Sequence, residues 1–191
     1  MENLRCEWCG ALPIYVNYHD EEWGVPEYDS RALWEKLILD GFQAGLSWLT
    51  ILKKRDAFRM AFSGFNPEKV AAFSDADVLR LLGNVEIVRH RGKIEAAIKG
   101  AQAWISLEEK QGFDQFIWDY VDGAPLINKF ETQAQVPTSS DMSLRISEDL
   151  KKAGFTFCGP TIVYAWMEAT GLINNHLVTC HRHEAVQELA R

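Results

Sequence analysis

The chain has 191 residues, a formal net charge of −7 and a hydrophobic content of 47%. This length predicts a single domain over 1–191, which we expect to form two helical lobes around one core. The acidic balance argues against a protein that coats nucleic acid nonspecifically. No apolar run approaches the roughly 18 residues of a membrane span, and no secretory signal is recognisable, so we expect a cytoplasmic protein without membrane contact.

Helix-start signals recur through the first half of the chain. Residues 29–30 can cap a helix whose apolar positions between 33 and 38 recur with the helical period. Apolar residues recur with the same period over 46–62. Asn66 before Pro67 predicts another helix start, because proline is favoured at the first helical position. Residues 74–82 begin with a capping-box pattern and predict a short helix.

The second half also predicts helices and shows little sign of strands. A long helix is expected from about 91 to 109 and a shorter one over 113–120. Residues 122–140 contain proline, serine and threonine, so we expect mainly a connecting loop there. Apolar residues rarely alternate with period two, so the predicted fold class is all-α. Further helices are expected at about 141–152, 161–170 and 176–180.

Residues 75–99 combine a short helix, a tight turn and a basic helix, an order typical of a helix-hairpin-helix. In such a hairpin, turn amides and basic side chains, here Arg89, Arg91 and Lys93, hold DNA phosphates without reading bases. The motif is weak because the usual Gly-x-Gly turn is absent. From the residues alone, a solvated helix face is the favoured interpretation of these charges.

Cysteine and histidine residues gather at the two ends of the chain. Cys6 and Cys9 precede His19, while His176 and Cys180 stand four positions apart, a spacing that places both on one face if the segment is helical. Zinc prefers tetrahedral nitrogen and sulfur ligation, so two such pairs predict a structural zinc site that ties the ends together. The spacing leaves Cys9 and His19 as competing ligands. In a reducing cytosol, thiols or metal ligands are expected rather than disulfides.

Asp40 lies three residues after Leu37 and seven after Leu33, on the apolar face of its predicted helix. A carboxylate in that position is costly unless another group pairs with it. One interpretation is a helix cap or a bridge to a basic side chain, which the residues alone favour. The other is an acceptor that faces a ligand in an aromatic cavity.

Five aromatic side chains cluster in sequence around the N-terminal cysteines and Asp40. Most Trp and Tyr residues belong to a core or to its polar edge. Five beside one carboxylate would also suit a slot for a flat aromatic ligand, and each ring face attracts a cation by about 0.5–2 kcal/mol. These residues are Trp8, Tyr15, Tyr18, Trp23 and Trp48. No phosphate-binding loop, dinucleotide fingerprint or nucleophile elbow is recognisable.

Five sequence blocks, in one order over nearly the whole chain, carry a family resemblance. The blocks are Cys6-x-Trp8, Tyr18-His-Asp-x-Glu-Trp-Gly-Val-Pro26, Asp40-Gly-Phe-Gln-Ala-Gly-Leu-Ser-Trp48, Arg89-His-Arg-Gly-Lys93 and Asn175-His-x3-Cys180. Together they resemble the bacterial 3-methyladenine DNA glycosylase I family. The resemblance implies an all-α, helix-hairpin-helix DNA glycosylase fold, with a zinc clasp from 6–19 and 176–180 that joins the N- and C-termini.

The resemblance also implies roles for single residues. Family zinc ligands correspond to Cys6, His19, His176 and Cys180, which implies one structural Zn²⁺ per chain. Family base-binding residues fall on Tyr18, Trp48 and Asp40, and Trp8, Tyr15 and Trp23 are expected to line or neighbour the slot. Arg89, Arg91 and Lys93 become expected DNA contacts.

The implied activity is hydrolysis of the N-glycosidic bond of 3-methyladenine in double-stranded DNA, by a monomer that leaves an abasic site. Asp40 is the candidate catalytic residue, although the family has Glu there, and the shorter side chain retreats by about 1.5 Å. The resemblance also implies that the catalytic Asp of other superfamily members is absent, so no general base is named. Two alternatives remain: a zinc-dependent hydrolase with an open metal position, and a non-enzymatic helical DNA-binding module.

Overall fold

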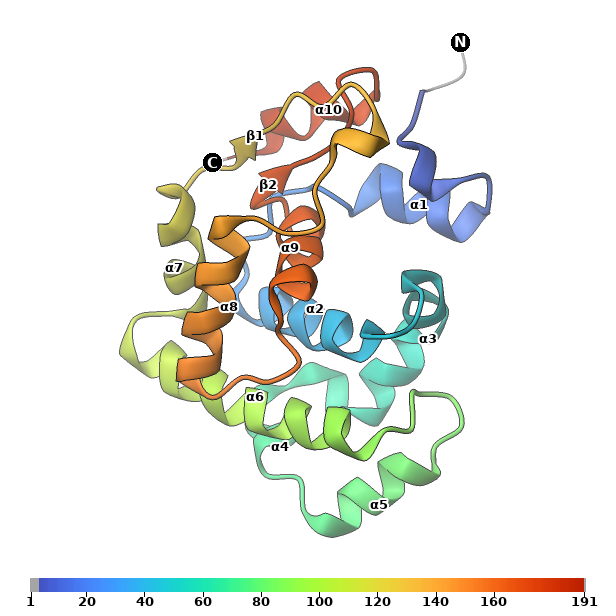
Figure 1. Cartoon of the computed structure of the whole chain (residues 1–191). Coiled ribbons are helices and arrows are strands. Elements are labelled where there is room, and N and C mark those ends of the chain that lie inside the picture. Colours follow the sequence, from blue (N-terminus) through green and yellow to red (C-terminus); the bar gives the residue numbers. More distant parts are fainter. Residues whose placement is uncertain (1–3, 191) are drawn as a thin grey trace.

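The computed structural model describes residues 4–190, which form a mostly helical protein (Figure 1). The predicted helical class is therefore confirmed. The helices are α1 Pro13–Glu21, α2 Ser30–Gln43, α3 Trp48–Ala61, α4 Pro67–Ala71, α5 Asp75–Gly83, α6 Arg91–Lys110, α7 Phe113–Trp118, α8 Asp141–Ala153, α9 Pro160–Ala169 and α10 Arg182–Ala185. Short 3-10 turns are η1 Glu7–Cys9, η2 Ser63–Phe65, η3 Asp119–Val121, η4 Gln133–Gln135 and η5 Gln187–Leu189.

Side-chain caps begin several helices where the sequence predicts them. Asp29 accepts a hydrogen bond from the first turn of α2, and Asn66 does the same for α4, in which Pro67 is the first residue. Ser74 and Asp77 form the expected capping box of α5. These acceptors satisfy amide groups that have no partner within the helix, so each cap fixes a helix start.

The segment 176–180 is not helical, contrary to the sequence prediction. It follows β2, Ile173–Asn174, which pairs in parallel with β1, Leu126–Ile127, inside the predicted loop. The Asn174 side chain accepts from the backbone N–H of His176 at 3.1 Å. An asparagine that binds the backbone two residues on favours a turn over a helix. His176 and Cys180 are therefore brought together by a turn.

Helix α1 was not assigned from the sequence, although Pro13 at its first position is a helix-start signal. The helix carries no continuous apolar stripe. Its Tyr15 and Tyr18 side chains line a cavity and do not pack into the main core. Because sequence patterns detect helices mainly by their core-facing stripe, a cavity-lining helix gives a weak signal.

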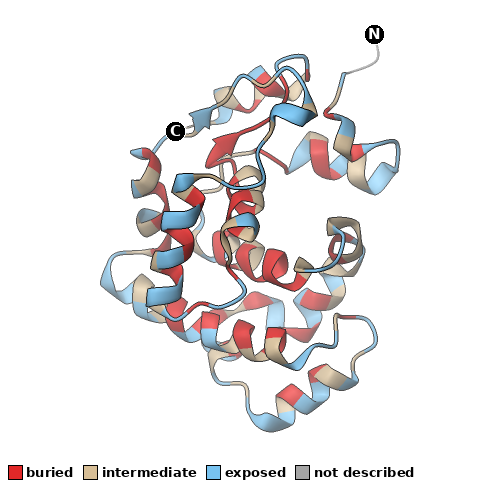
Figure 2. Cartoon of the chain, in the orientation of Figure 1, coloured by how far each residue is buried: buried red, intermediate tan, exposed pale blue. Residues whose placement is uncertain are grey.

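Two hydrophobic cores organise the chain. The larger surrounds α2, which packs against α3, α6, α7 and α9, and the buried residues in Figure 2 concentrate along these helices. A smaller core joins the two ends of the chain and includes Tyr18, Leu52 and Leu177. Among the described residues, no helix combines the length and apolar character needed to cross a membrane.

Candidate functional site

Four side chains from the two ends of the chain meet in a buried group, called here the Cys/His cluster: Cys6, His19, His176 and Cys180. Their potential ligand atoms all lie within 4.8 Å of one another. Cys180 Sγ lies 3.5 Å from both His19 Nε2 and His176 Nδ1. Cys6 Sγ lies 3.7 Å from His176 Nδ1.

These separations suit a tetrahedral metal site. Zinc–sulfur and zinc–nitrogen bonds of about 2.3 and 2.1 Å place neighbouring donors about 3.5 Å apart. Two thiols and two imidazoles are a donor set that zinc favours. The residues present therefore fit a four-coordinate zinc ion whose ligands all come from the protein.

Hydrogen bonds orient both imidazole rings of the cluster. His19 Nδ1 lies 2.8 Å from Asp20 Oδ1, and Asp20 in turn pairs with Arg5 at 2.7 Å. The hydrogen bond from Arg5, aided by His19, lowers the pKa of Asp20 to about 2, so this carboxylate stays ionised. His176 Nε2 lies 3.0 Å from the Trp23 carbonyl. Such partners leave Nε2 of His19 and Nδ1 of His176 facing the cluster centre.

Other cysteine and histidine residues near the chain ends lie outside the cluster. The Cys9 thiol contacts the Gly10 carbonyl at 3.6 Å, so the structure brings His19, and not Cys9, to the cluster. His181 contacts the Leu4 carbonyl, and His183 contacts the Asn128 carbonyl. Cys9, the competing ligand that the sequence left open, therefore lies outside the Cys/His cluster.

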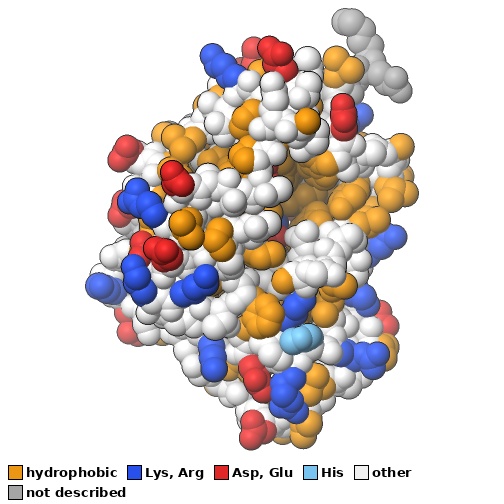
Figure 3. All heavy atoms as spheres, viewed as in Figure 1, with side chains coloured by type: hydrophobic (Ala, Val, Ile, Leu, Met, Phe, Trp, Pro, Cys, Tyr) orange, Lys and Arg blue, Asp and Glu red, His pale blue; other side chains and the backbone are white. Residues whose placement is uncertain are grey.

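A cavity of about 200 Å³ lies between α1, α2, α3 and α9. It is called here the aromatic cavity, and a hollow with mainly hydrophobic walls is visible in Figure 3. Its lining residues are Trp8, Tyr15, Tyr18, Trp23, Lys36, Asp40, Gln43, Trp48, Gln133, Val136, Ala165, Glu168, Ala169 and Asn175. The six residues predicted to bind a base are all among them.

The aromatic walls of the cavity hold one another in place. The Tyr18 and Trp48 ring centroids are 5.4 Å apart, and Trp8 lies 5.0 Å from Trp23. Tyr15 accepts a hydrogen bond from the Leu49 backbone at 3.0 Å, which ties α1 to the start of α3. Burial raises the pKa of Tyr18, so its phenol is neutral. The result is a largely rigid slot with flat sides.

Asp40 lies on the floor of the aromatic cavity and is only 1% exposed. Both of its carboxylate oxygens accept from Lys36 Nζ, at 2.6 and 2.7 Å. The same ammonium group lies 3.9 Å from the centroid of Trp48. Asp40 thus forms the bridge to a basic side chain that one interpretation predicted, and it also lines an aromatic cavity. Its role as an acceptor for a ligand stays a prediction. Burial raises the pKa of Asp40 and lowers that of Lys36, while their mutual attraction opposes both shifts.

A second carboxylate in the cavity was missed by sequence reasoning. Glu168, in the last turn of α9, accepts a hydrogen bond from Asn175 at 2.7 Å. Burial raises the pKa of Glu168 to about 7, and the nearby Asp40 adds to the shift. No local pattern marks Glu168, because it is brought to Asp40 only by the packing of α9 on α2.

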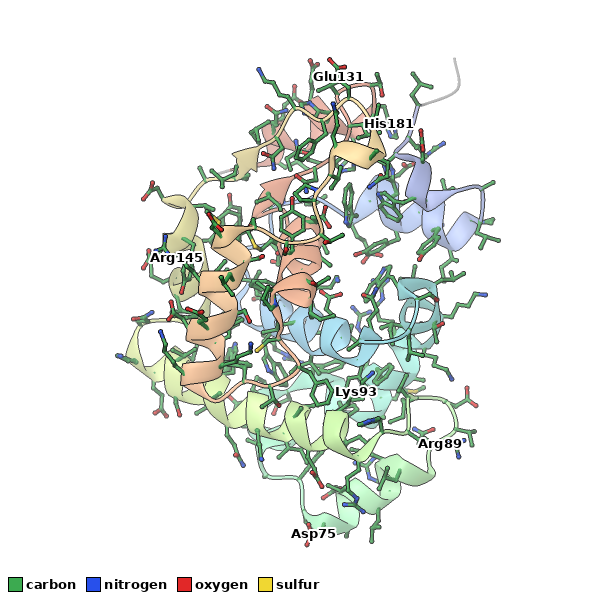
Figure 4. All side chains as sticks on the ribbon, in the orientation of Figure 1. Asp75, Arg89, Lys93, Glu131, Arg145 and His181 are labelled. Atoms are coloured by element: carbon green, nitrogen blue, oxygen red, sulfur yellow. The ribbon has the colours of Figure 1, made fainter. Side chains whose placement is uncertain are left out.

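The residues expected to contact DNA are not placed alike. Arg89, in the segment before α6, is exposed (Figure 4). Arg91, the first residue of α6, is also exposed. Lys93 departs from the prediction: its side chain is buried, and Nζ donates to the Phe42 and Ala44 carbonyls at 2.9 and 2.6 Å. Lys93 points inward because carbonyls at the end of α2 need donors, so it is not an exposed phosphate contact.

Comparisons with known proteins support one family. Residues 8–183 match the methyladenine glycosylase family. The chain is 48% identical over 177 residues to the DNA-3-methyladenine glycosylase 1 of Escherichia coli (strain K12), which covers 92% of this chain and 95% of that protein.

Solved structures give the same result. A crystal structure of 3-methyladenine DNA glycosylase I superposes with a TM-score of 0.93 at 48% identity, over 94% of this chain and 100% of that one. A Staphylococcus aureus 3-methyladenine DNA glycosylase I, solved to explain 3-methyladenine recognition, has a TM-score of 0.91 at 43% identity, over 94% and 96% of the two chains. The chain therefore belongs to the methyladenine glycosylase family.

Proposed function

We propose that this chain is a DNA repair glycosylase that hydrolyses the N-glycosidic bond of 3-methyladenine in double-stranded DNA, acting as a monomer. The single observation that carries the proposal is the aromatic cavity, in which Tyr18, Trp48 and Asp40 converge, in a chain of this family. Its relatives are named for the same activity. The products are the free base and an abasic site.

The chemistry follows from the charge of the lesion. Methylation makes the purine cationic, so it leaves as a neutral base and needs little general-acid help. The nucleotide must first be flipped from the stack, which costs a few kcal/mol and less for a damaged base. Tyr18 and Trp48, which contact each other, then form one aromatic wall against the ring and attract its positive charge. Normal adenine gains no such attraction.

Asp40 is the proposed acceptor for the exocyclic amine. A carboxylate has about four lone-pair sites, so hydrogen bonds from Lys36 leave room for one from the base. Because Asp40 is buried beside aromatic rings, this hydrogen bond forms in a site that excludes most water. Asp40 thus positions the base, while Lys36 balances the charge of this carboxylate.

The proposed DNA surface is a helix-hairpin-helix formed by α5, the turn after it and α6. Lys54 of α3 donates to the Val85 and Glu86 carbonyls in this turn, at 3.2 and 3.0 Å, and so supports its shape. Arg89 and Arg91 are exposed beside it and are proposed to bind phosphates. Lys93 is not part of the proposed DNA surface, because its Nζ donates to carbonyls at the end of α2.

We also propose that the Cys/His cluster binds one structural zinc ion. The support is the donor set, the separations that suit tetrahedral ligation and the two oriented imidazoles. Four protein ligands leave no position for a reactive water molecule, which distinguishes this site from that of a zinc hydrolase. When bound, the ion would hold the chain ends beside the aromatic cavity.

Product analysis tests the proposal against its two alternatives. Purified protein is incubated with methylated duplex DNA, and the released base is identified by chromatography and mass spectrometry. We expect 3-methyladenine. A DNA-binding module would bind the duplex in a salt-dependent way and release nothing. A zinc hydrolase would lose turnover on brief chelation and regain it with metal.

The variant Asp40→Asn tests the role of the floor carboxylate. We expect excision to fall by about 100-fold or more, since one preorganised electrostatic contact is worth about that factor. The matched control is Asp122→Asn, an exposed aspartate in a left-handed conformation that asparagine tolerates. Undiminished excision by a folded Asp40→Asn variant would remove Asp40 from the site.

A further inference from the structure

Lys36 neutralises the carboxylate that the cavity offers to a cation. Its Nζ binds both oxygens of Asp40 and also lies 3.9 Å from the centroid of the Trp48 ring. Whichever of the two side chains holds the shared proton, the Lys36–Asp40 pair carries no net charge. A cationic purine therefore gains a hydrogen-bond acceptor from Asp40, but no uncompensated negative charge.

Glu168 lines the same cavity, but its hydrogen-bond partner is a neutral amide and not a cation. Asn175 Nδ2 donates to its Oε1, while its Oε2 has no hydrogen-bond partner among residues 4–190. Asn175 is itself held by Tyr164, at 2.9 Å, and by Asn128, at 2.7 Å. One oxygen of Glu168 is thus fixed by a buried network, and the other remains available to a ligand.

We propose that Glu168 is a second base-binding carboxylate, which supplies the net negative charge that selects a cationic purine in this cavity. The inference rests on the proposed function and extends it to a residue outside the family blocks seen in the sequence. The ligand class is a purine made cationic by alkylation. The complete recognition set is then one acceptor, Asp40, one counter-ion, Glu168, and two aromatic faces, Tyr18 and Trp48.

Burial and charge around Glu168 agree with this role. The pKa of Glu168 is raised to about 7 by desolvation, and the groups that face it are Asp40 and Lys36 from α2 and Tyr18 from α1. A cation bound nearby stabilises the ionised form and so lowers that pKa. Glu168 therefore loses its proton more readily when a cationic purine binds beside it.

The test uses the 3,9-dimethyladeninium cation, in which a methyl group replaces the sugar and the charge persists at neutral pH. Neutral 9-methyladenine is the reference ligand, and binding is measured by calorimetry at pH 8. We expect Glu168→Gln to weaken the cation about tenfold or more, which corresponds to one charge contact at close range. Binding of the neutral ligand should change less than about twofold, since no charge contact is lost.

Two further variants separate charge from structure. Glu168→Asp keeps the charge and should retain cation selectivity. Lys36→Met with Glu168→Gln restores a net charge of −1 through Asp40 alone, and we expect cation affinity within about threefold of the unmodified chain. Equal weakening of cation and neutral ligand by Glu168→Gln would overturn the proposal, as would an unchanged cation affinity.

Excision of 3-methyladenine by the same preparations separates the two levels of inference. If the unmodified chain releases the base and Glu168→Gln binds the cation normally, the role of Glu168 is wrong and the proposed function stands. If the unmodified chain neither binds the cation nor releases the base, both are wrong.

Discussion

Asp40 shows how one side chain can satisfy a structural and a functional demand together. A fully buried carboxylate needs a partner, and Lys36, one helical turn earlier, supplies it. The same pairing removes the charge that a cationic ligand would use. In this cavity the charge is restored by Glu168, from another helix, so recognition is shared between α2 and α9.

The free energy of unfolding tests how much the burial of ionised Glu168 destabilises the folded chain. Because burial raises the pKa of folded Glu168 to about 7, the folded chain binds more protons than the unfolded chain from about pH 4.5 to 7. Stability is therefore lost as pH rises through this window. We expect Glu168→Gln to raise the free energy of unfolding by on the order of 1–3 kcal/mol at pH 8, with little effect near pH 4.5. Urea denaturation at the two pH values provides the check, and a gain of equal size at both would contradict it.

At the residue scale, the sequence indicates site residues that are close in sequence and misses those that only the fold brings together. Aromatic residues and Asp40 were predictable because they are close in sequence or lie in family blocks. Lys36 sits at helical spacing from Asp40 but resembles an ordinary exposed lysine. Glu168 enters the cavity only through the fold, so no sequence pattern indicates it. Asn175 lies in a family block, but that block does not show that its side chain binds Glu168.

At the scale of elements, the α5–α6 hairpin separates two basic roles that look alike in sequence. Arg89 and Arg91 are exposed, whereas Lys93, two residues on, is 7% exposed and bonded to the end of α2. Sequence patterns predicted both helices and the capping box of α5, because these features depend on nearby residues. They could not show which basic side chain turns inward, since that depends on the position of α2.

The salt dependence of DNA binding tests whether Arg89 and Arg91 contact phosphates. Arg89→Gln and Arg91→Gln should each weaken duplex binding and reduce the slope of log K against log salt concentration by about 0.9, the value for one phosphate contact. Fluorescence anisotropy over a salt series measures this slope. Lys99→Gln is an exposed control on the same helix. Slopes equal to that of the unmodified chain would exclude these arginines from the phosphate surface.

Lys93→Met should lower stability and leave the salt dependence of DNA binding unchanged. Loss of its hydrogen bonds to Phe42 and Ala44 leaves carbonyls without donors and lowers the free energy of unfolding by about 1–3 kcal/mol. The salt slope should stay unchanged, because Nζ is not on the surface. Chemical denaturation and the same anisotropy series measure the two quantities. A reduced slope without loss of stability would return Lys93 to the DNA surface.

At the scale of the whole molecule, the Cys/His cluster joins residues from the two chain ends, and the smaller core forms around it. Cys6 and Cys180 belong both to the cluster and to that core, which also includes Tyr18. The meeting of these four side chains was predicted from residue types and family blocks, while zinc binding stays a prediction. The backbone at the C-terminal pair was not predicted, because the helix expected over 176–180 is a turn.

Metal content and thermal stability test the clasp. The unmodified chain should contain one zinc ion, and Cys180→Ser should lose it and melt several degrees lower, because metal binding contributes to folding free energy. Cys9→Ala is the matched control: like Cys180→Ser it removes a buried thiol, but Cys9 lies outside the cluster, so zinc should remain. Metal content by mass spectrometry and melting by calorimetry give the answer. Retention of zinc by Cys180→Ser, or its loss from Cys9→Ala, would reassign the ligands.

The most direct measurement of the central claim is a crystal structure of the chain soaked with the 3,9-dimethyladeninium cation. We expect a purine ring packed against Tyr18 and Trp48, with its amine on Asp40 and Glu168 Oε2 facing its charged edge. A ring bound elsewhere on the protein, with Lys36 and the aromatic walls closed over an empty cavity, would contradict it.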